Sequence, residues 1–149
     1  MSASSLFALA ALFVGALIPL QVAFNAQLGG VTKNPYAAGL LVFMIGAGVM
    51  TVVAALMRAP LPPLAELRSA PPTIWLGGMI AAFYVLSAVI LTPKLGVGTM
   101  TIFILAGQIF MALLLDHLGA FGNPVQSLNI WRIVGGTMVL GGAVLIRTH

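Results

Sequence analysis

Five apolar runs of roughly 20 residues restrict what this chain can fold into. They cover about residues 6–28, 37–57, 74–91, 99–118 and 128–146. An α-helix rises 1.5 Å per residue, so each run matches the ~30 Å hydrocarbon core of a bilayer. No alternating strand pattern competes with the helical one. The runs predict an all-α membrane protein, a bundle of five helices in a single transmembrane domain over residues 1–149.

The composition supports a membrane protein, because 61% of the residues are hydrophobic and only 5% are charged. Soluble domains carry about 25% charged residues. The basic residues are scattered singly at helix ends, which argues against a nucleic-acid partner. Cysteine is absent, which excludes disulfides and thiol chemistry. Because no metal-ligand spacing, nucleophile–base pair or phosphate loop is present, we expect no enzyme, no metal and no cofactor.

Polar residues interrupt the first apolar run beside a proline. Pro19 removes a backbone donor and should bend or loosen the helix, so it is the candidate hinge. Gln21 and Asn25 follow one turn apart and therefore share a helix face. A polar stripe beside a helix break suits a solute site between transmembrane helices. The alternative is that both amides only hold neighbouring helices together.

Two further polar side chains fall deep within predicted spans. Gln108 lies nine residues into its helix, about 14 Å deep, and Tyr84 lies at a similar depth. Hydrocarbon offers such groups no hydrogen-bond partner, so they need another side chain or water. We predict that Gln21, Asn25, Tyr84 and Gln108 line a solute pathway. Interhelical hydrogen bonds are the alternative for both residues.

The basic residues are shared equally between the two membrane faces. Side A carries the N-terminus and the connections after the second and fourth helices, and side B carries the other connections and the C-terminus. Side A holds Arg58, Arg68 and Arg132, and side B holds Lys33, Lys94 and Arg147. Lys and Arg bias normally orients a bundle. Equal numbers predict dual topology, in which oppositely inserted copies form an inverted pair.

Asp116 and His117 end the fourth predicted helix on side A. Asp116 is the carboxylate nearest a helix interior, and a His can titrate near neutral pH, so both are candidates for proton coupling. Both lie close to water, so the alternative is a solvated helix end with an ion pair between Asp116 and Arg132. The last helix carries the glycine pairs Gly135–Gly136 and Gly141–Gly142. We predict that these small residues pack against another helix, including one of a second subunit.

Several short motifs occur in a definite order along the chain. They are Pro-Leu-Gln-x3-Asn-x2-Leu-Gly from Pro19, Asn34-Pro35-x3-Gly39, Trp75-Leu-Gly-Gly, Ala82-Phe-Tyr-Val-Leu-Ser, Pro93-x-Leu95-Gly96, Ala106-Gly-Gln and Asp116-His117-x-Gly119. Together they resemble the YdcZ-type branch of the drug/metabolite transporter superfamily, which consists of short five-helix inner-membrane proteins. The resemblance implies one half of a ten-helix inverted-repeat transporter, a multi-pass location in the bacterial plasma membrane, and export of small organic molecules. The first helix lacks the embedded Glu of the short multidrug-resistance relatives, so their proton exchange does not carry over.

We therefore expect a secondary transporter subunit that exports small organic metabolites or drugs by alternating access. Its partners would be the solute, the lipid bilayer, and either an antiparallel second copy or a paired five-helix homologue. Few fixed charges suggest a neutral, aromatic or weakly cationic solute. The alternative is a non-transporting scaffold or partner subunit of a heteromeric membrane complex. A passive channel is disfavoured because no ring of charge is visible.

Overall fold

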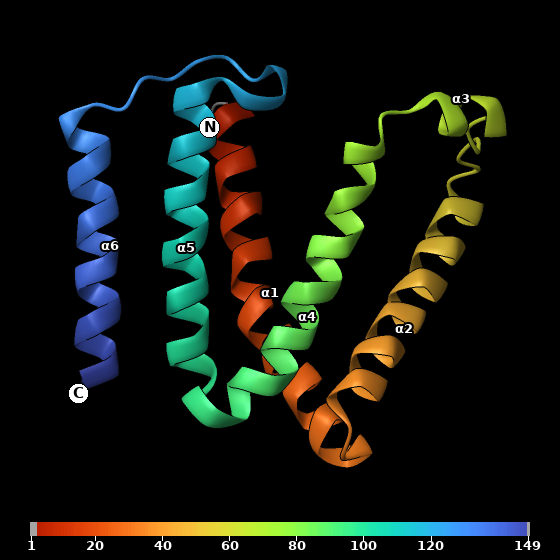
Figure 1. Ribbon diagram of the computed structural model, residues 1–149, viewed down its shortest axis with the longest axis horizontal. Coiled ribbons are helices and arrows are strands. Elements are labelled where there is room, and N and C mark those ends of the chain that lie inside the picture. The colour runs from red at the N-terminus through yellow and green to blue at the C-terminus, as the bar shows by residue number, and fades with distance from the viewer. Residues whose placement is uncertain (1–2, 149) are drawn as a thin grey trace. The chain divides into compact units, whose positions relative to one another are not determined.

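The computed structural model describes residues 3–148 as a series of helices joined by short connections, without a strand in that range (Figure 1). The helices are α1 (Ala3–Thr32), α2 (Pro35–Leu56), α3 (Leu64–Ser69), α4 (Leu76–Leu95), α5 (Val97–Leu118) and α6 (Ile130–Thr148), with 3-10 turns η1 (Pro72–Trp75) and η2 (Ala120–Gly122). Within the described residues, five helical segments are long and apolar enough to cross a membrane. They coincide with the five predicted runs, so the all-α membrane fold is confirmed.

Two predicted helix breaks are not breaks in the structure. The first predicted helix stops at Leu28, just before the glycine pair Gly29–Gly30, but α1 continues through this pair to Thr32. Likewise the third predicted helix stops at Leu91, before Pro93, but α4 includes Pro93 and extends to Leu95. A glycine costs a helix only about 1 kcal/mol, whereas an unsatisfied backbone group in hydrocarbon costs several. The helix therefore continues through residues that would end it in water.

The helix ends have clear local causes. Lys33 adopts a left-handed φ of 50° after α1, and Asn34 caps α2 by accepting hydrogen bonds at Oδ1 from the amides of Tyr36 and Ala37. Gly96 has a φ of 82° and is the only residue between α4 and α5. Both features turn the chain within one or two residues at the membrane boundary.

The chain divides into two compact units, which meet twice along the sequence. The first unit contains residues up to Pro19 and from Leu95 onward, and the second contains Leu20–Lys94. One junction follows Pro19, which lies inside α1, and the other follows Lys94, directly after Pro93. Each junction thus lies next to a proline, where a helix lacks one backbone hydrogen bond.

The core of the second unit lies along one stripe of α4. Val85, Ala88, Val89 and Thr92 are buried, at intervals of three and four residues. Val89 meets Gly29 of α1 so closely that a Cβ added to the glycine would lie 2.6 Å from Val89 Cγ1. The last turn of α1 therefore packs against α4 at Val89 with almost no space between the two helices.

In the first unit, α5 and α6 run side by side (Figure 1). Gly136 is buried on α6, where a Cβ would lie 3.4 Å from Leu113 Cδ1 of α5. At the other end of the pair, the Arg147 guanidinium lies 5.8 Å from the centroid of the Phe103 ring. This separation allows a cation–π contact that joins the last turn of α6 to α5.

Most apolar side chains on the spans are not covered by the chain itself. Only 6–17% of the most apolar window of each span is buried, and Leu12 and Phe13 are 71% and 67% exposed. A soluble domain could not leave such a surface open to water. These faces are available to lipid or to a second protein chain.

Candidate functional site

The two amides of the α1 stripe have different surroundings, although they lie one turn apart. Asn25 is only 6% exposed, and its Nδ2 atom is buried with no hydrogen-bond partner among the described residues. Gln21 is exposed. The sequence predicted one polar face, and the structure gives one inward and one outward amide.

Two further polar atoms of the second unit are buried without a partner among the described residues, both on α4. These atoms are the hydroxyl oxygen of the half-buried Tyr84 and the Oγ1 atom of the buried Thr92. The second unit therefore contains three buried polar atoms that have no hydrogen-bond partner among the described residues, one each on Asn25, Tyr84 and Thr92. A buried polar group without a partner costs about 1–3 kcal/mol, so such groups indicate a partner that a single dry chain does not supply.

Gln108 is placed near the middle of α5 and is exposed. Its side chain makes no hydrogen bond within residues 3–148. Thr101 lies two turns earlier on the same helix, and its Oγ1 atom is buried and unpartnered there. Thr92 and Thr101 were not singled out from the sequence, because a threonine in a helix normally bonds to its own backbone.

Asp116 and His117 form part of a network at the side A end of α5. Arg132 Nη1 lies 3.2 Å from Asp116 Oδ2, and the same guanidinium donates hydrogen bonds to the backbone oxygen and the side-chain oxygen of Gln126. The Leu128 amide donates to His117 Nδ1 at 3.3 Å. Through these contacts, the connection between α5 and α6 is hydrogen-bonded to both helices.

The sequence named the Asp116–Arg132 ion pair as the alternative to a proton-coupling role, and that pair is present. Its side chains are 41% exposed at Asp116 and 27% exposed at Arg132. Solvent-exposed pairs of this kind contribute about 0.2–1 kcal/mol. The pair is thus a helix-end contact in this structure, and a role for Asp116 or His117 in coupling stays a prediction.

The α6 glycines divide between two surroundings. Gly136 is buried against α5, as described above, and Gly142 is half-buried. Gly135 and Gly141 are exposed, and a Cβ at either would meet nothing within 4 Å. Gly136 thus packs within the chain, while Gly135 and Gly141 remain open to another helix, and packing of the glycines against a second subunit stays a prediction.

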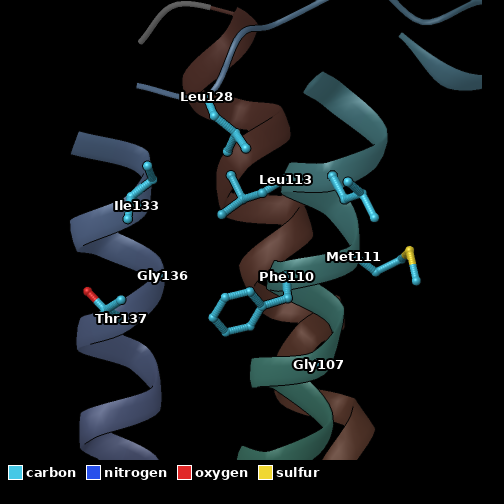
Figure 2. Close-up of a pocket in the computed structure, with 9 residues that line it drawn as sticks. Gly107, Phe110, Met111, Leu113, Leu128, Ile133, Gly136 and Thr137 are labelled. Carbon is cyan, nitrogen blue, oxygen red and sulfur yellow. The ribbon is translucent and has the colours of Figure 1, made fainter. Parts of the chain in front are cut away.

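A groove of about 410 Å³ lies between α5 and α6. Figure 2 shows Phe110 and Leu113 of α5 pointing toward α6, across from Ile133 and Thr137. Its walls are almost entirely apolar, and Thr137 is the one hydroxyl residue among those that line it. Gln108 is not among the lining residues, although its neighbour Gly107 is.

The second unit carries a groove of about 500 Å³ where α1 and α4 end. Its lining residues include Gly29, Gly30 and Lys33, with Val89 and Ile90 on the α4 side. The sequence did not predict this groove, because the first predicted helix stops at Leu28, before the glycines that line it. The paired glycines beside a single lysine were the available signal.

The described residues contain no group of three or more His, Cys, Asp or Glu side chains that could hold a metal ion. What the chain does offer is a set of amide, hydroxyl and phenol groups inside apolar helices, with its charged groups at the helix ends. That chemistry suits the binding of an organic solute by hydrogen bonds and apolar contact.

Residues 6–145 match the family described as "Putative inner membrane exporter, YdcZ". The chain belongs to this family. No curated protein and no solved structure matches it. The YdcZ resemblance carried by the ordered motifs is thereby confirmed. The family description names export and the inner membrane, so this YdcZ chain is grouped with multi-pass transport proteins rather than with enzymes.

Proposed function

We propose that this YdcZ-family chain is one subunit of a secondary transporter that exports small organic molecules by alternating access. Two oppositely oriented copies form the working unit, with their amide groups facing a shared pathway. The observation that carries the proposal is the exposure of Gln21 and Gln108 at mid-span positions of α1 and α5. An amide facing lipid at that depth has no hydrogen-bond partner, so a second chain or a solvated pathway must supply one.

The number of basic residues supports the opposed arrangement. Three Arg residues on side A and three Lys or Arg residues on side B leave the chain without a preferred orientation. Carboxylates have little influence on insertion, so the Asp116–Arg132 pair does not disturb this balance. Opposed copies would recreate the inverted repeat that many single-chain transporters carry internally.

Within this proposal, Asn25 and Tyr84 bind the solute in the second unit. Each has a buried polar atom without a hydrogen-bond partner among the described residues, so each can form a hydrogen bond with a bound solute. Pro19 is the hinge, since it lies at the junction between the two compact units. The scarcity of charge on the spans favours a neutral, aromatic or weakly cationic solute.

Proton coupling would run through Asp116 and His117. Protonating Asp116 would remove the charge that holds Arg132, and protonating His117 at Nδ1 would remove the acceptor for the Leu128 amide. Both changes would loosen the connection between α5 and α6 on side A. Proton uptake at these two residues would thereby be linked to movement of that connection during export.

The test of transport uses the purified chain in proteoliposomes with a panel of neutral, aromatic and weakly cationic solutes. Gln21→Leu and Gln108→Leu should each lower the export rate at least tenfold. Gln27→Leu is the matched control, because Gln27 is an exposed amide of the same helix nearer its end, and it should stay within twofold. If the first two variants transport normally and melt at higher temperature, the glutamines face lipid and the proposal is wrong.

Topology is tested separately with a single cysteine, which is unique because the chain has none. Leu61→Cys places it in the side A connection after α2, where Leu61 is 87% exposed. A membrane-impermeant thiol reagent should label about half of the molecules in intact cells and all of them after permeabilisation. Labelling of none or all in intact cells would instead favour a heteromeric complex with a second five-helix chain, including the non-transporting partner subunit.

Coupling is tested with Asp116→Asn, compared with the unmodified chain under an imposed pH gradient. The variant should keep solute binding and lose the acceleration of export by the gradient. Equal acceleration in both chains would remove Asp116 from the coupling mechanism without affecting the transport proposal.

A further inference from the structure

The groove where α1 and α4 end in the second unit, here called the α1–α4 groove, combines an apolar wall with one cation. Its volume is about 500 Å³. Ala26, Gly29 and Gly30 line it from α1, Val89 and Ile90 line it from α4, and Lys33 lines it from the turn after α1. All these residues belong to one compact unit. The groove therefore combines apolar groups from both helices with one cationic residue, Lys33, which directly follows α1.

The two glycines have different roles in shaping this groove. Gly29 brings α1 into contact with Val89, where even one added carbon would lie at 2.6 Å. Gly30 leaves open space, because a Cβ at that position would meet nothing within 4 Å. The contact between Gly29 and Val89 thus closes the groove on one side. Because glycine has no side chain, the space next to Gly30 remains open.

The charge of Lys33 is not balanced within the described chain. The sequence contains only two carboxylate side chains, Glu66 and Asp116. Asp116 pairs with Arg132 in the other unit. Glu66 lies in α3, beyond the far end of the 22-residue α2, which is about 33 Å long. No side-chain carboxylate of the chain therefore lies near Lys33, which leaves it available to an anion from outside.

The position of Lys33 identifies the source of that anion. Lys33 directly follows the last residue of α1, so its ammonium lies at the boundary of the hydrocarbon, where lipid phosphates lie. Ala26 is seven residues earlier, about 10 Å deeper along the helix. The groove can thus hold a phosphate beside Lys33 and a segment of acyl chain between Gly30 and Ile90. Basic pockets between transmembrane helices bind anionic lipid headgroups by this combination.

We propose that the α1–α4 groove binds one anionic phospholipid, with its phosphate on Lys33 and an acyl chain against the Gly30 face of α1. The site is independent of the transport proposal, since it uses neither the mid-span amides nor a second copy. Its occupancy fixes the side B end of the α1–α4 contact to the lipid headgroup layer.

The test measures lipid binding by native mass spectrometry of the full chain released from detergent, titrated with phosphatidylglycerol or with phosphatidylcholine of the same acyl chains. Lys33→Gln should weaken phosphatidylglycerol binding about fivefold and leave phosphatidylcholine binding unchanged. Lys94→Gln is the charge-matched control. It removes a cation from the end of α4 in the same unit, and Lys94 does not line the groove.

A second pair of variants tests the apolar part of the groove. Gly30→Leu fills the open space and should weaken binding of both lipids at least fivefold. Gly15→Leu is its control, because Gly15 also lies in α1 with nothing within 4 Å of an added Cβ and does not line the groove. Melting temperatures of all four variants establish that each chain is folded.

Three results would overturn the proposal. One is equal weakening by Lys33→Gln and Lys94→Gln, which would mean that general surface charge attracts the lipid. Another is equal weakening by Gly30→Leu and Gly15→Leu, which would mean that the lipid binds elsewhere. The third is displacement of phosphatidylglycerol by millimolar glycerol 3-phosphate, which would assign the site to a free anion.

Discussion

Replacing Gly29 by alanine tests the closest helix contact in the second unit. The new Cβ would lie 2.6 Å from Val89 Cγ1, well inside the 3.5–4.0 Å at which two carbon atoms attract each other. Val89 is buried, only 3% exposed, and a valine in a helix has essentially one allowed rotamer. The methyl group therefore cannot turn aside, and the two helices must separate.

The cost can be isolated by comparison with Gly30→Ala. Both substitutions replace glycine by alanine at adjacent positions of α1, so both gain about 1 kcal/mol of helix propensity. Only the Gly29 variant creates a clash, since a Cβ at Gly30 meets nothing within 4 Å. Overpacking of a tight contact costs about 1–3 kcal/mol. We expect Gly29→Ala to be less stable than Gly30→Ala by this amount.

The measurement is the free energy of unfolding in detergent micelles, obtained by steric trapping or by titration with a denaturing detergent. Val89→Ala provides the rescue, because it removes the clashing methyl group. The double variant Gly29→Ala/Val89→Ala should be more stable than the sum of the two single effects by about 1 kcal/mol or more. Equal stability of the Gly29 and Gly30 variants, or purely additive effects in the double variant, would refute the contact.

The remaining predictions concern the helix ends. A double-mutant cycle of Asp116→Asn and Arg132→Gln should give a coupling in unfolding free energy of about 0.2–1 kcal/mol, which should fall at high salt. A coupling above about 2 kcal/mol would mean that the pair is far less solvated than its exposure indicates. Gly119→Ala should cost about 1–2 kcal/mol of stability, because Gly119 has a φ of 59°, and a Cβ there would lie 2.6 Å from Val125 Cγ2; no change in melting temperature would contradict this. Asn34→Ala should cost about 0.5–2 kcal/mol by removing the α2 cap, whereas Asn34→Asp should retain most of it.

Helix number and approximate limits followed from the sequence because hydrocarbon thickness sets the length of each span. Which side chains of each helix are buried and which are exposed did not follow from the sequence. In a soluble helix, an apolar stripe marks the buried face, but here both faces of α1 are apolar and Leu12 is 71% exposed. Polar positions such as Gln21 and Asn25 could be located at the right depth, and only coordinates could separate the exposed amide from the buried one.

Side-chain contacts at the membrane boundary were partly predictable. The Asp116–Arg132 pair was anticipated because each residue lies at the side A end of its own helix and the two helices are consecutive. The hydrogen bond from the Leu128 amide to His117 was not anticipated, because it depends on how residues 119–129 fold back. The α1–α4 groove depends on the close contact between Gly29 and Val89. No pattern of residues along the sequence predicts that these two positions meet.

The amide and charged side chains of the described chain differ in their partners according to depth, whereas the unpartnered hydroxyls of Thr92 and Thr101 lie near helix ends. At the helix ends, Asn34, Asp116 and Arg132 have partners within the chain, although water is available there to satisfy them. At mid-span, Asn25 Nδ2 is buried and unpartnered and Gln108 is exposed, where hydrocarbon can satisfy neither. A chain that works alone would show the opposite distribution. The missing partners at mid-span are therefore expected from a second chain, from water in a pathway, or from the transported solute, and the glutamine variants in proteoliposomes distinguish these from simple exposure to lipid.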